Sequence, residues 1–343
     1  MKKLVIIGGG FAGSQIARKL ENKFDTILID TKDYFEFTPG ILRTLVEPGH
    51  AKKIQIKHRD YLAKTNIKLG KVTGFDSNAV FIGEKKISFD YLVIASGSRY
   101  SFPIKHKNII LPNRVSELVS ANKRLQKSKT IVIIGGGLVG VELAGEICAK
   151  YNKKKKIIII HSKDRLLGRN AKKVSDYAKR FLIKKGVNIL LNEKALRYNE
   201  HIETNKGTKI KPDLAFICTG IIPNSEFVKN NLKNERGYVA VNDYLQLNNF
   251  KNIFAVGDLT SVREEKTAQN AEKHADLIVD NILALEKNHE LKKYKSSSRF
   301  MIISLGKNNG IILKNNFMIV GFFSGLAKTI FEWIFMKRFI SHN

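Results

Sequence analysis

Short, wholly apolar runs alternate along the chain with stretches whose apolar residues recur at helical spacing. Residues 4–7 and 130–134 are apolar throughout, which is typical of central strands in a parallel sheet. Each run leads into a glycine-rich turn and then into a helical stretch, at residues 14–20 and 141–150. Further strands are expected at residues 26–29, 91–97, 157–160, 214–220 and 252–258. Strands that alternate with helices in this way predict an α/β fold with parallel sheets.

The first glycine turn has the pattern of a dinucleotide-binding fingerprint. It consists of Gly8, Gly9, Gly10, Phe11, Ala12 and Gly13. In this pattern Gly8 permits the tight turn, Gly10 lets the backbone approach a pyrophosphate, and Gly13 packs the helix against the strand. The next strand ends in Asp30, close to the interval of about 20 residues at which an acid meets a ribose hydroxyl. This order of elements favours a nucleotide site over an ordinary glycine-rich turn.

A second turn repeats the pattern. It consists of Gly135, Gly136, Gly137, Leu138, Val139 and Gly140. Two such turns in one chain suggest a relay, in which a soluble nucleotide reduces a bound one. The ribose position after the second turn holds His161 instead of an acid, which predicts weak discrimination between NADH and NADPH. Lys163 and Arg165 either tolerate a 2′-phosphate or are solvated loop charges.

Several other residues are candidates for contact with the nucleotides. Glu142 lies in the first turn of the second helix, where a carboxylate either favours the helix dipole or orients a nicotinamide carboxamide. We favour the second role. Three later strands end in small residues that can border a cofactor, namely Ala95 and Gly97, Gly220, and Gly257 with Asp258. Asp258 could hydrogen-bond a flavin ribityl hydroxyl, although a Gly-Asp turn alone is commonplace.

The composition limits the class of protein. A chain of 343 residues suits about two domains, and its formal charge of +29 attracts anionic membranes or nucleic acid. The lysines are scattered without interleaved aromatic residues, which disfavours nucleic acid, and a general lysine-rich bias explains the charge equally well. The dense run from Lys153 to Lys156 is expected to be solvated. With only Cys148 and Cys218, no disulfide framework, redox pair or metal site is expected, and a cytoplasmic location fits.

Taken together, these residues resemble the two-dinucleotide-binding-domain flavoproteins over nearly the whole chain. The resemblance is strongest to the type II NADH dehydrogenases and to the ferroptosis-suppressor (apoptosis-inducing-factor-like) NAD(P)H:quinone reductases. The residues that carry it are 46–53 (VEPGHAKK), 140–142 (GVE), 160–162 (IHS), 218–220 (CTG) and 304–310 (SLGKNNG).

The resemblance implies interleaved FAD and NAD(P) domains and a quinone acceptor. It places flavin contacts at the first glycine turn, Asp30, Arg43, Val72 and Asp258. It also places Gln269, with Thr267 and Ala268, along the approach of the quinone. Lys273 and His274 follow as candidate proton donors, although a surface position for His274 is the more frequent situation.

Two departures from the related families bear on the electron acceptor and on membrane contact. The chain lacks the cysteine pair of the disulfide reductases and the catalytic cysteines of the sulfide:quinone reductases, so quinone, oxygen or a dye-like acceptor is expected. Met1-Lys2 lacks the glycine that amino-terminal myristoylation requires. No run reaches the ~20 apolar residues needed to span a bilayer.

Residues 322–339 offer another means of membrane contact. Apolar residues recur there at helical spacing, at Phe323, Leu326, Ala327, Ile330, Phe331, Ile334 and Phe335. Ser324, Lys328 and Glu332 form a polar stripe, and Trp333, Lys337 and Arg338 lie near the end. This pattern fits a helix that lies in a membrane interface, or one that packs on its own domain or on a homodimer partner. We favour the membrane.

The sequence therefore predicts an FAD-dependent NAD(P)H:quinone oxidoreductase, peripheral to the inner face of a membrane. The FAD domain is expected at residues 1–115 and 240–295, the NAD(P) domain at 116–239, and a small carboxy-terminal α+β segment at 296–343. Two alternatives remain open. One is a soluble NAD(P)H oxidase or ferredoxin-type reductase, and the other is a basic flavoprotein that binds nucleic acid.

Overall fold

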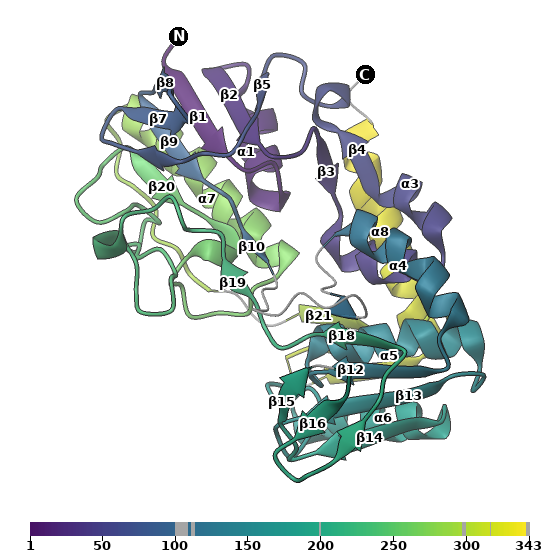
Figure 1. Ribbon diagram of the computed structural model, residues 1–343. Helices are drawn as coiled ribbons and strands as arrows, with labels where there is room; N and C mark the ends of the chain where they lie inside the picture. The colour runs from purple at the N-terminus through teal and green to yellow at the C-terminus, as the bar shows by residue number, and fades with distance from the viewer. Residues whose placement is uncertain (100–108, 111–113, 199, 297–299, 316, 341–343) are drawn as a thin grey trace.

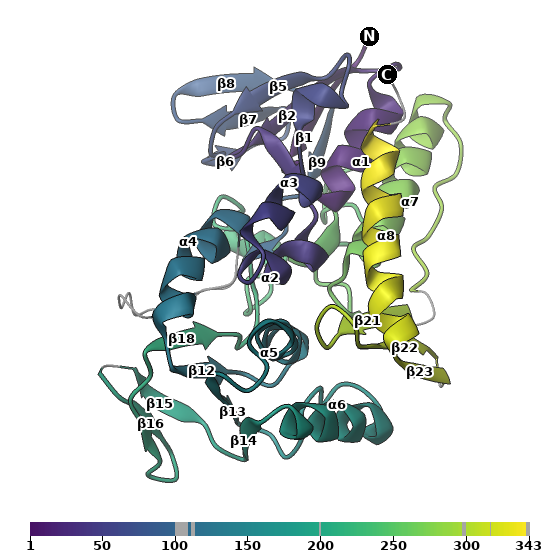
Figure 2. The same ribbon diagram turned by 90° about the vertical axis from the view of Figure 1, so that its right-hand side faces the viewer.

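A computed structural model describes residues 1–99, 109–110, 114–198, 200–296, 300–315 and 317–340. Its first sheet is parallel throughout, with the strand order β20-β9-β1-β2-β5. The strands are β1 (Lys3–Ile7), β2 (Asp25–Asp30), β5 (Asn66–Leu69), β9 (Tyr91–Ile94) and β20 (Ile253–Ala255). Helices α1 (Phe11–Leu20) and α7 (Ala268–Glu286) lie side by side on this sheet (Figures 1 and 2). Although β20 and α7 come late in the sequence, they complete the unit that begins at the amino terminus.

The second sheet repeats this parallel plan with the strand order β11-β18-β12-β13-β14. The strands are β11 (Ile109–Ile110), β12 (Thr130–Ile134), β13 (Lys156–His161), β14 (Val187–Leu191) and β18 (Leu214–Ile217). Helices α5 (Leu138–Tyr151) and α6 (Lys172–Lys184) lie beside it in the lower lobe of Figure 1. The predicted α/β fold with two dinucleotide-type sheets is confirmed.

Shorter helices and strands complete the two lobes and the region between them. The helices are α2 (Ile41–Thr44), α3 (Ala51–Ile54) and α4 (Val115–Lys127). The minor strands pair as β3 (Tyr34–Glu36) with β4 (Gln55–Lys57), β10 (Ser98–Arg99) with β19 (Ile222–Pro223), β6 (Gly74–Phe75) with β7 (Ala79–Ile82) and β8 (Lys85–Ser88), and β15 (Ala195–Tyr198) with β16 (Ile202–Thr204) and β17 (Lys209–Ile210). The antiparallel pair β10–β19 is one point where segments from both halves of the chain meet.

The carboxy-terminal segment is an antiparallel sheet followed by a long helix. Its strands are β21 (Phe300–Ser304), β22 (Gly310–Lys314) and β23 (Phe317–Gly321), and the helix is α8 (Phe322–Ile340). Figure 2 shows α8 running from this sheet along α1 and α7. The helix therefore reaches from the second lobe to the first. No helix in the described part of the chain is long and apolar enough to cross a membrane.

One expectation about charge is wrong. Lys155, in the run expected to be solvated, is only 9% exposed. Its Nζ donates hydrogen bonds to the carbonyl oxygens of Leu125 (2.6 Å), Gln126 (3.1 Å) and Ser128 (2.6 Å) at the end of α4. Carbonyls at a helix carboxyl end lack partners within the helix, and a cation satisfies them. Burial lowers the pKa of Lys155. The residue is a helix cap.

Candidate active site

The first glycine turn places an open backbone at the start of α1. Gly8 has a φ of +101°, and a Cβ there would lie 2.5 Å from the Ala95 carbonyl oxygen, so only glycine fits. An added Cβ at Gly13 would overlap the carbonyl oxygen of Gly8. At Gly10, by contrast, nothing lies within 4 Å of an added Cβ, and no side chain caps the helix. Free N–H groups beside open space fit a pyrophosphate.

Asp30 belongs to a buried network beneath this turn that the sequence analysis did not anticipate. Its Oδ2 accepts a hydrogen bond from the Gly9 N–H at 2.6 Å and lies 3.7 Å from Nε2 of His58. The His58 Nδ1 is 2.7 Å from the Tyr61 hydroxyl, which is 2.7 Å from Oγ of Ser14. Burial raises the pKa of Asp30, but contacts with His58 and the Gly9 N–H outweigh it and hold the pKa below its ordinary value. The carboxylate is thus charged and fixed.

The second turn has the same backbone conformation as the first, but a histidine contacts it in place of an aspartate. Gly135 has a φ of +112°, and an added Cβ at Gly137 would meet nothing within 4 Å. Gly136 N–H donates to Nδ1 of His161 at 3.1 Å. Burial lowers the pKa of His161, so its imidazole is neutral at pH 7 and carries its proton on Nε2. Leu138 and Val139 begin α5, and both are half-buried.

Glu142 is buried and paired. It is 6% exposed, and its Oε1 accepts hydrogen bonds from the Ser304 N–H at 2.8 Å and from Nζ of Lys328 at 2.7 Å. Lys328 comes from α8, so the carboxyl-terminal helix supplies the countercharge for a residue at the second turn. The pair places a countercharge within hydrogen-bonding distance of a buried carboxyl group. In the sequence Lys328 belongs to a polar stripe, and nothing in its periodicity connects it with Glu142.

Arg43 lies beside this pair and is also buried. Its Nη2 is 3.5 Å from Oε1 of Glu146, and its Nη1 donates to Oγ1 of Thr329 at 3.3 Å. The Arg43 Nε has no hydrogen-bond partner although it is buried. A buried donor without a partner is costly, and an anionic or carbonyl group of a bound flavin would satisfy it. Together with the open backbone at Gly10, this donor fits the FAD that the resemblance implies.

Asp258 lies in a short turn whose support comes from His274. The turn begins at Gly257, which has a φ of +75°, and Asp258 accepts a hydrogen bond from Oγ of Ser98 at 2.8 Å. Gly257 N–H donates to Nδ1 of His274 at 3.0 Å, and Nε2 of His274 lies 2.9 Å from Oε1 of Glu264. Burial raises the pKa of Asp258.

Two expectations about His274 are therefore wrong. The residue is 0% exposed, so it is not a surface histidine. Both of its ring nitrogens face protein groups, so it has no free face from which to protonate a substrate. It holds the Gly257 turn instead. Periodicity along α7 could have indicated its burial, because Ala271, Ala275 and Ile278 on the same helix are also buried.

The remaining predicted residues border the same turns. Gly97 and Gly220 have φ values of +66° and +116°, and an added Cβ at either would meet nothing within 4 Å. Phe11 packs its ring against Phe35 and Phe37, while Ala12 is buried in α1. Val72 is buried with the outer side chains of the first sheet.

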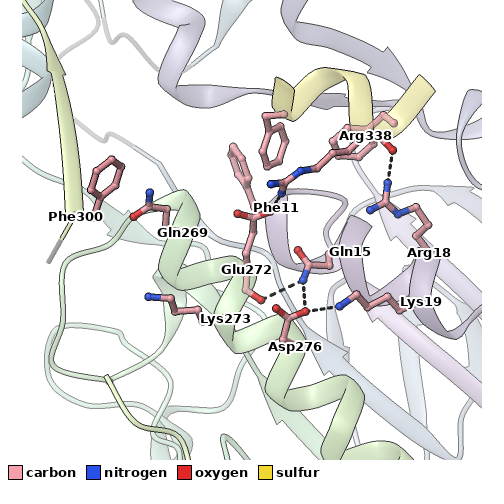
Figure 3. A pocket seen from close by; sticks show the side chains of 12 residues that line it. Phe11, Gln15, Arg18, Lys19, Gln269, Glu272, Lys273, Asp276, Phe300 and Arg338 are labelled. Atoms are coloured by element: carbon pink, nitrogen blue, oxygen red, sulfur yellow. Dashed lines mark hydrogen bonds and ion pairs between the residues drawn. The ribbon is translucent and has the colours of Figure 1, made fainter. Parts of the chain in front are cut away.

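Two cavities meet at Gln269. One, of about 530 Å³, lies between α1, α7 and α8, and the other, of about 420 Å³, extends toward Arg169 in the second lobe. Gln269 and Phe300 line both. Figure 3 shows the first cavity with Gln269, Glu272 and Lys273 from α7 on one side and Arg338 from α8 on the other. Gln269 thus lies where the two cavities adjoin.

The faces of α8 differ from the predicted arrangement. The expected polar stripe faces the protein, because Ser324 and Glu332 are buried and Lys328 pairs with Glu142. Glu332 lies 3.1 Å from Nε2 of His50. Phe335, assigned to the lipid-facing side, is buried against the rings of Phe11, Phe35 and Phe37. The polar stripe faces the protein because Lys328 and Glu332 find charged or polar partners there, in Glu142 and His50.

The outer face of α8 is apolar. Its exposed side chains are Phe322, Phe323, Leu326, Ile330, Trp333 and Ile334. Phe317, Ile319 and Val320 on the neighbouring β23 are exposed as well. Lys337 places its Nζ 3.8 Å from the centre of the Trp333 ring. Neighbouring exposed apolar side chains of this kind are typical of interaction surfaces.

The described residues contain no metal-binding cluster and no reactive thiol. No group of histidine, cysteine, aspartate or glutamate side chains there is arranged to hold a metal ion. Cys148 and Cys218 are free and buried, and burial raises the pKa of the Cys148 thiol to about 11. Thiols of this kind are poor nucleophiles.

Comparison with known proteins gives a consistent result. The sequence profile of the pyridine nucleotide-disulphide oxidoreductases matches residues 2–275. Ferroptosis suppressor protein 1 of Mus musculus is 33% identical over 345 residues, which cover 95% of this chain and 92% of the relative.

Solved structures share the fold. The sulfide:quinone oxidoreductase of Aquifex aeolicus superimposes with a TM-score of 0.89 at 22% identity, covering 100% of this chain and 92% of the other. NDH2 of Plasmodium falciparum in complex with NADH superimposes with a TM-score of 0.86 at 17% identity, covering 99% of this chain and 97% of the other.

Proposed function

The chain belongs to the pyridine nucleotide-disulphide oxidoreductase family and, within it, to the group of ferroptosis suppressor protein 1, and on that premise we propose that it is an FAD-dependent NAD(P)H:quinone oxidoreductase. One observation carries the proposal. Two parallel sheets each end a central strand in an open glycine turn at an uncapped helix start. One turn holds FAD and the other holds the nicotinamide nucleotide.

The flavin supplies the redox chemistry, because it accepts a hydride from a nicotinamide and passes two electrons to an acceptor. The protein positions the two nucleotides. Asp30 fixes the first turn and accepts the ribose hydroxyls, and Arg43 directs its unpaired Nε toward the flavin. Glu142 orients the nicotinamide carboxamide, and the ion pair with Lys328 holds the Glu142 side chain in position. The Gly257 turn carries Asp258 to the ribityl chain.

The nicotinamide site accepts both NADH and NADPH. Its ribose position holds a neutral imidazole at His161, which does not repel a 2′-phosphate as a carboxylate would. Nδ1 of that imidazole accepts a hydrogen bond from the Gly136 N–H, and the ring also hydrogen-bonds to the backbone of Arg165. The neutral ring is thus held at the ribose position, where it repels neither a hydroxyl nor a phosphate.

The acceptor enters the cavity of about 530 Å³ between α1, α7 and α8. Phe11, Phe300, Phe335 and Phe339 supply apolar walls for a quinone ring. Electrons do not leave through a dithiol, because the two cysteines are buried and lie on different elements, α5 and the end of β18. Gln269, which lines this cavity and the adjoining one, contributes a polar side chain to the acceptor site.

The outer face of α8 docks on an anionic membrane surface, which delivers the apolar acceptor. Phe323 is 76% exposed and Trp333 is 57% exposed, while Lys337 lies where headgroups would be. Replacing both Phe323 and Trp333 by serine should abolish co-sedimentation with vesicles that contain anionic lipid. Ile183→Ser, which alters an exposed apolar residue on α6, is the matched control and should bind as the wild type does.

Stopped-flow spectroscopy of the purified yellow protein tests the reaction. Mixing with NADH or NADPH should bleach the flavin, and a short-chain quinone added next should restore its colour. Bleaching that oxygen reverses but quinone does not would replace the quinone reductase with an oxidase.

A further inference from the structure

Reduction of a quinone needs one proton more than a nicotinamide supplies. Oxidation of NAD(P)H releases a hydride, which is two electrons and one proton, whereas a quinone takes up two electrons and two protons to become a hydroquinone. The second proton must therefore reach the acceptor through the protein. Resting on the proposed quinone reductase function, we propose that the carboxyl group of Glu272 donates this proton from the wall of the acceptor cavity.

The position of Glu272 is the first reason. It lies on α7 one helical turn after Gln269, so both side chains face the same cavity. Its side chain is 20% exposed and points from α7 toward Arg338 on α8 (Figure 3). Nη1 of Arg338 is 3.3 Å from Oε1 of Glu272. The carboxyl group thus lies inside the cavity, close enough to solvent to be protonated again after each turnover.

The surrounding charges suit a group that gives up and regains a proton. Burial raises the pKa of Glu272, while Arg338 on α8 and Arg18 and Lys19 on α1 oppose that effect and Asp276 adds to it. The cations stabilise the carboxylate that remains once the proton has left. A carboxyl group whose pKa is raised above its ordinary value holds its proton more readily, which suits a general acid.

The other ionisable side chains that line the cavity are less suitable. Asp276 is 54% exposed and is held by Lys19 at 2.5 Å. Arg18 and Arg338 are guanidinium groups, which keep their protons. Lys273 also faces the cavity from α7, beside Gln269 in Figure 3, as a cation that can attract a hydroquinone anion. Among these lining residues Glu272 is the one largely buried carboxyl group.

The test compares two acceptors in Glu272→Gln, which keeps the size of the side chain but cannot donate a proton as an acid. A quinone needs the proton, whereas ferricyanide takes electrons alone. Turnover with a short-chain quinone at pH 7 should fall on the order of 100-fold. Turnover with ferricyanide and the rate of flavin bleaching by NADH should stay within about twofold of the wild type. Glu272→Asp should restore part of the quinone turnover and keep its pH dependence.

Asp280→Asn is the matched control, because it makes the same change at an exposed position on α7. It should leave both acceptors unaffected. Equal losses with quinone and ferricyanide in Glu272→Gln, or no loss with quinone, would overturn the assignment of Glu272 while leaving the quinone reductase intact. Wild-type protein that reduces ferricyanide but no quinone would overturn both.

Discussion

The two glycine turns share a backbone and differ in the side chains that serve it. Gly8 and Gly135 have φ values of +101° and +112°, and Gly10 and Gly137 are equally open. Yet the first turn rests on a charged aspartate and the second on a neutral histidine. Under the proposed function, the backbone of both turns binds phosphate, and the residue at the end of the following strand selects between nucleotides at the ribose.

A second difference lies two residues beyond each turn. Gln15 occupies this position in the first unit and Glu142 in the second. Gln15 is half-buried and contacts Asp276 and the Glu272 carbonyl on α7, whereas Glu142 is buried and paired with Lys328. The first unit uses this position for packing between helices. The second uses it to hold a charge where the nicotinamide is expected.

The largest effect is expected from closing each turn in separate variants. Gly10→Val should yield colourless protein, because the new side chain fills the space of the flavin pyrophosphate. Gly137→Val should stay yellow but lose bleaching by NADH, with affinity reduced at least about 100-fold. Absorbance spectra and stopped-flow traces distinguish the two. If both variants lost the flavin, the two turns would not serve separate nucleotides.

Removing the countercharge of Glu142 should have the next largest effect. Lys328→Met leaves a buried carboxylate without its partner, which costs about 3–5 kcal/mol of unfolding free energy. The double variant Glu142→Gln with Lys328→Met should recover most of this loss. Gln15→Ala, at the matching position of the first unit, should cost less than about 1.5 kcal/mol. Urea denaturation measures all three, and a Lys328→Met protein as stable as the wild type would contradict the pairing.

The strand-end residue should control nucleotide choice. His161→Asp replaces a neutral imidazole with a carboxylate at the ribose position, so kcat/KM for NADPH should fall about tenfold relative to NADH, a difference of about 1.4 kcal/mol. His161→Asn, which stays neutral, is the control and should keep the wild-type ratio. An unchanged ratio in His161→Asp would mean that this residue does not face the ribose.

The smallest expected effect is a difference between His161 and Asp30 in the pH range over which each changes the stability of the fold. The pKa of His161 is lowered from 6.5, so the unfolded chain binds a proton there before the folded one does, and stability falls as the pH drops through 6.5. The pKa of Asp30 is lowered from 3.8, so its stabilising contribution persists above that pH and is lost only below it. Between pH 7 and 5.5 the Tm should fall by about 1–2 °C, and less in His161→Asn. If the Tm fell equally with pH in the wild type and in His161→Asn, His161 would not be the cause of the fall.

The local parts of this account could be predicted from sequence. A strand, a glycine turn and a helix are adjacent in the chain, so Gly8 to Gly13 and Gly135 to Gly140 revealed both units without tertiary information. The strand-end residues Asp30 and His161 followed from the same spacing.

The pairings between distant segments could not be predicted. Lys328 and Glu142 are far apart in sequence, and only the packing of α8 against the second lobe brings them together. The same packing placed the polar stripe of α8 against the protein and buried Phe335, which periodicity had assigned to the lipid-facing side. One signal was present: Lys328 and Glu332 lie four residues apart in the mostly apolar middle of the helix, which indicates a charged face that needs partners.

The claim that each turn holds its own nucleotide has one direct test, an anaerobic titration of the purified wild-type protein with NADH. The protein should be yellow, release FAD on denaturation, and lose its flavin colour completely as NADH approaches the flavin concentration. Protein that is colourless and takes up no FAD would contradict the account.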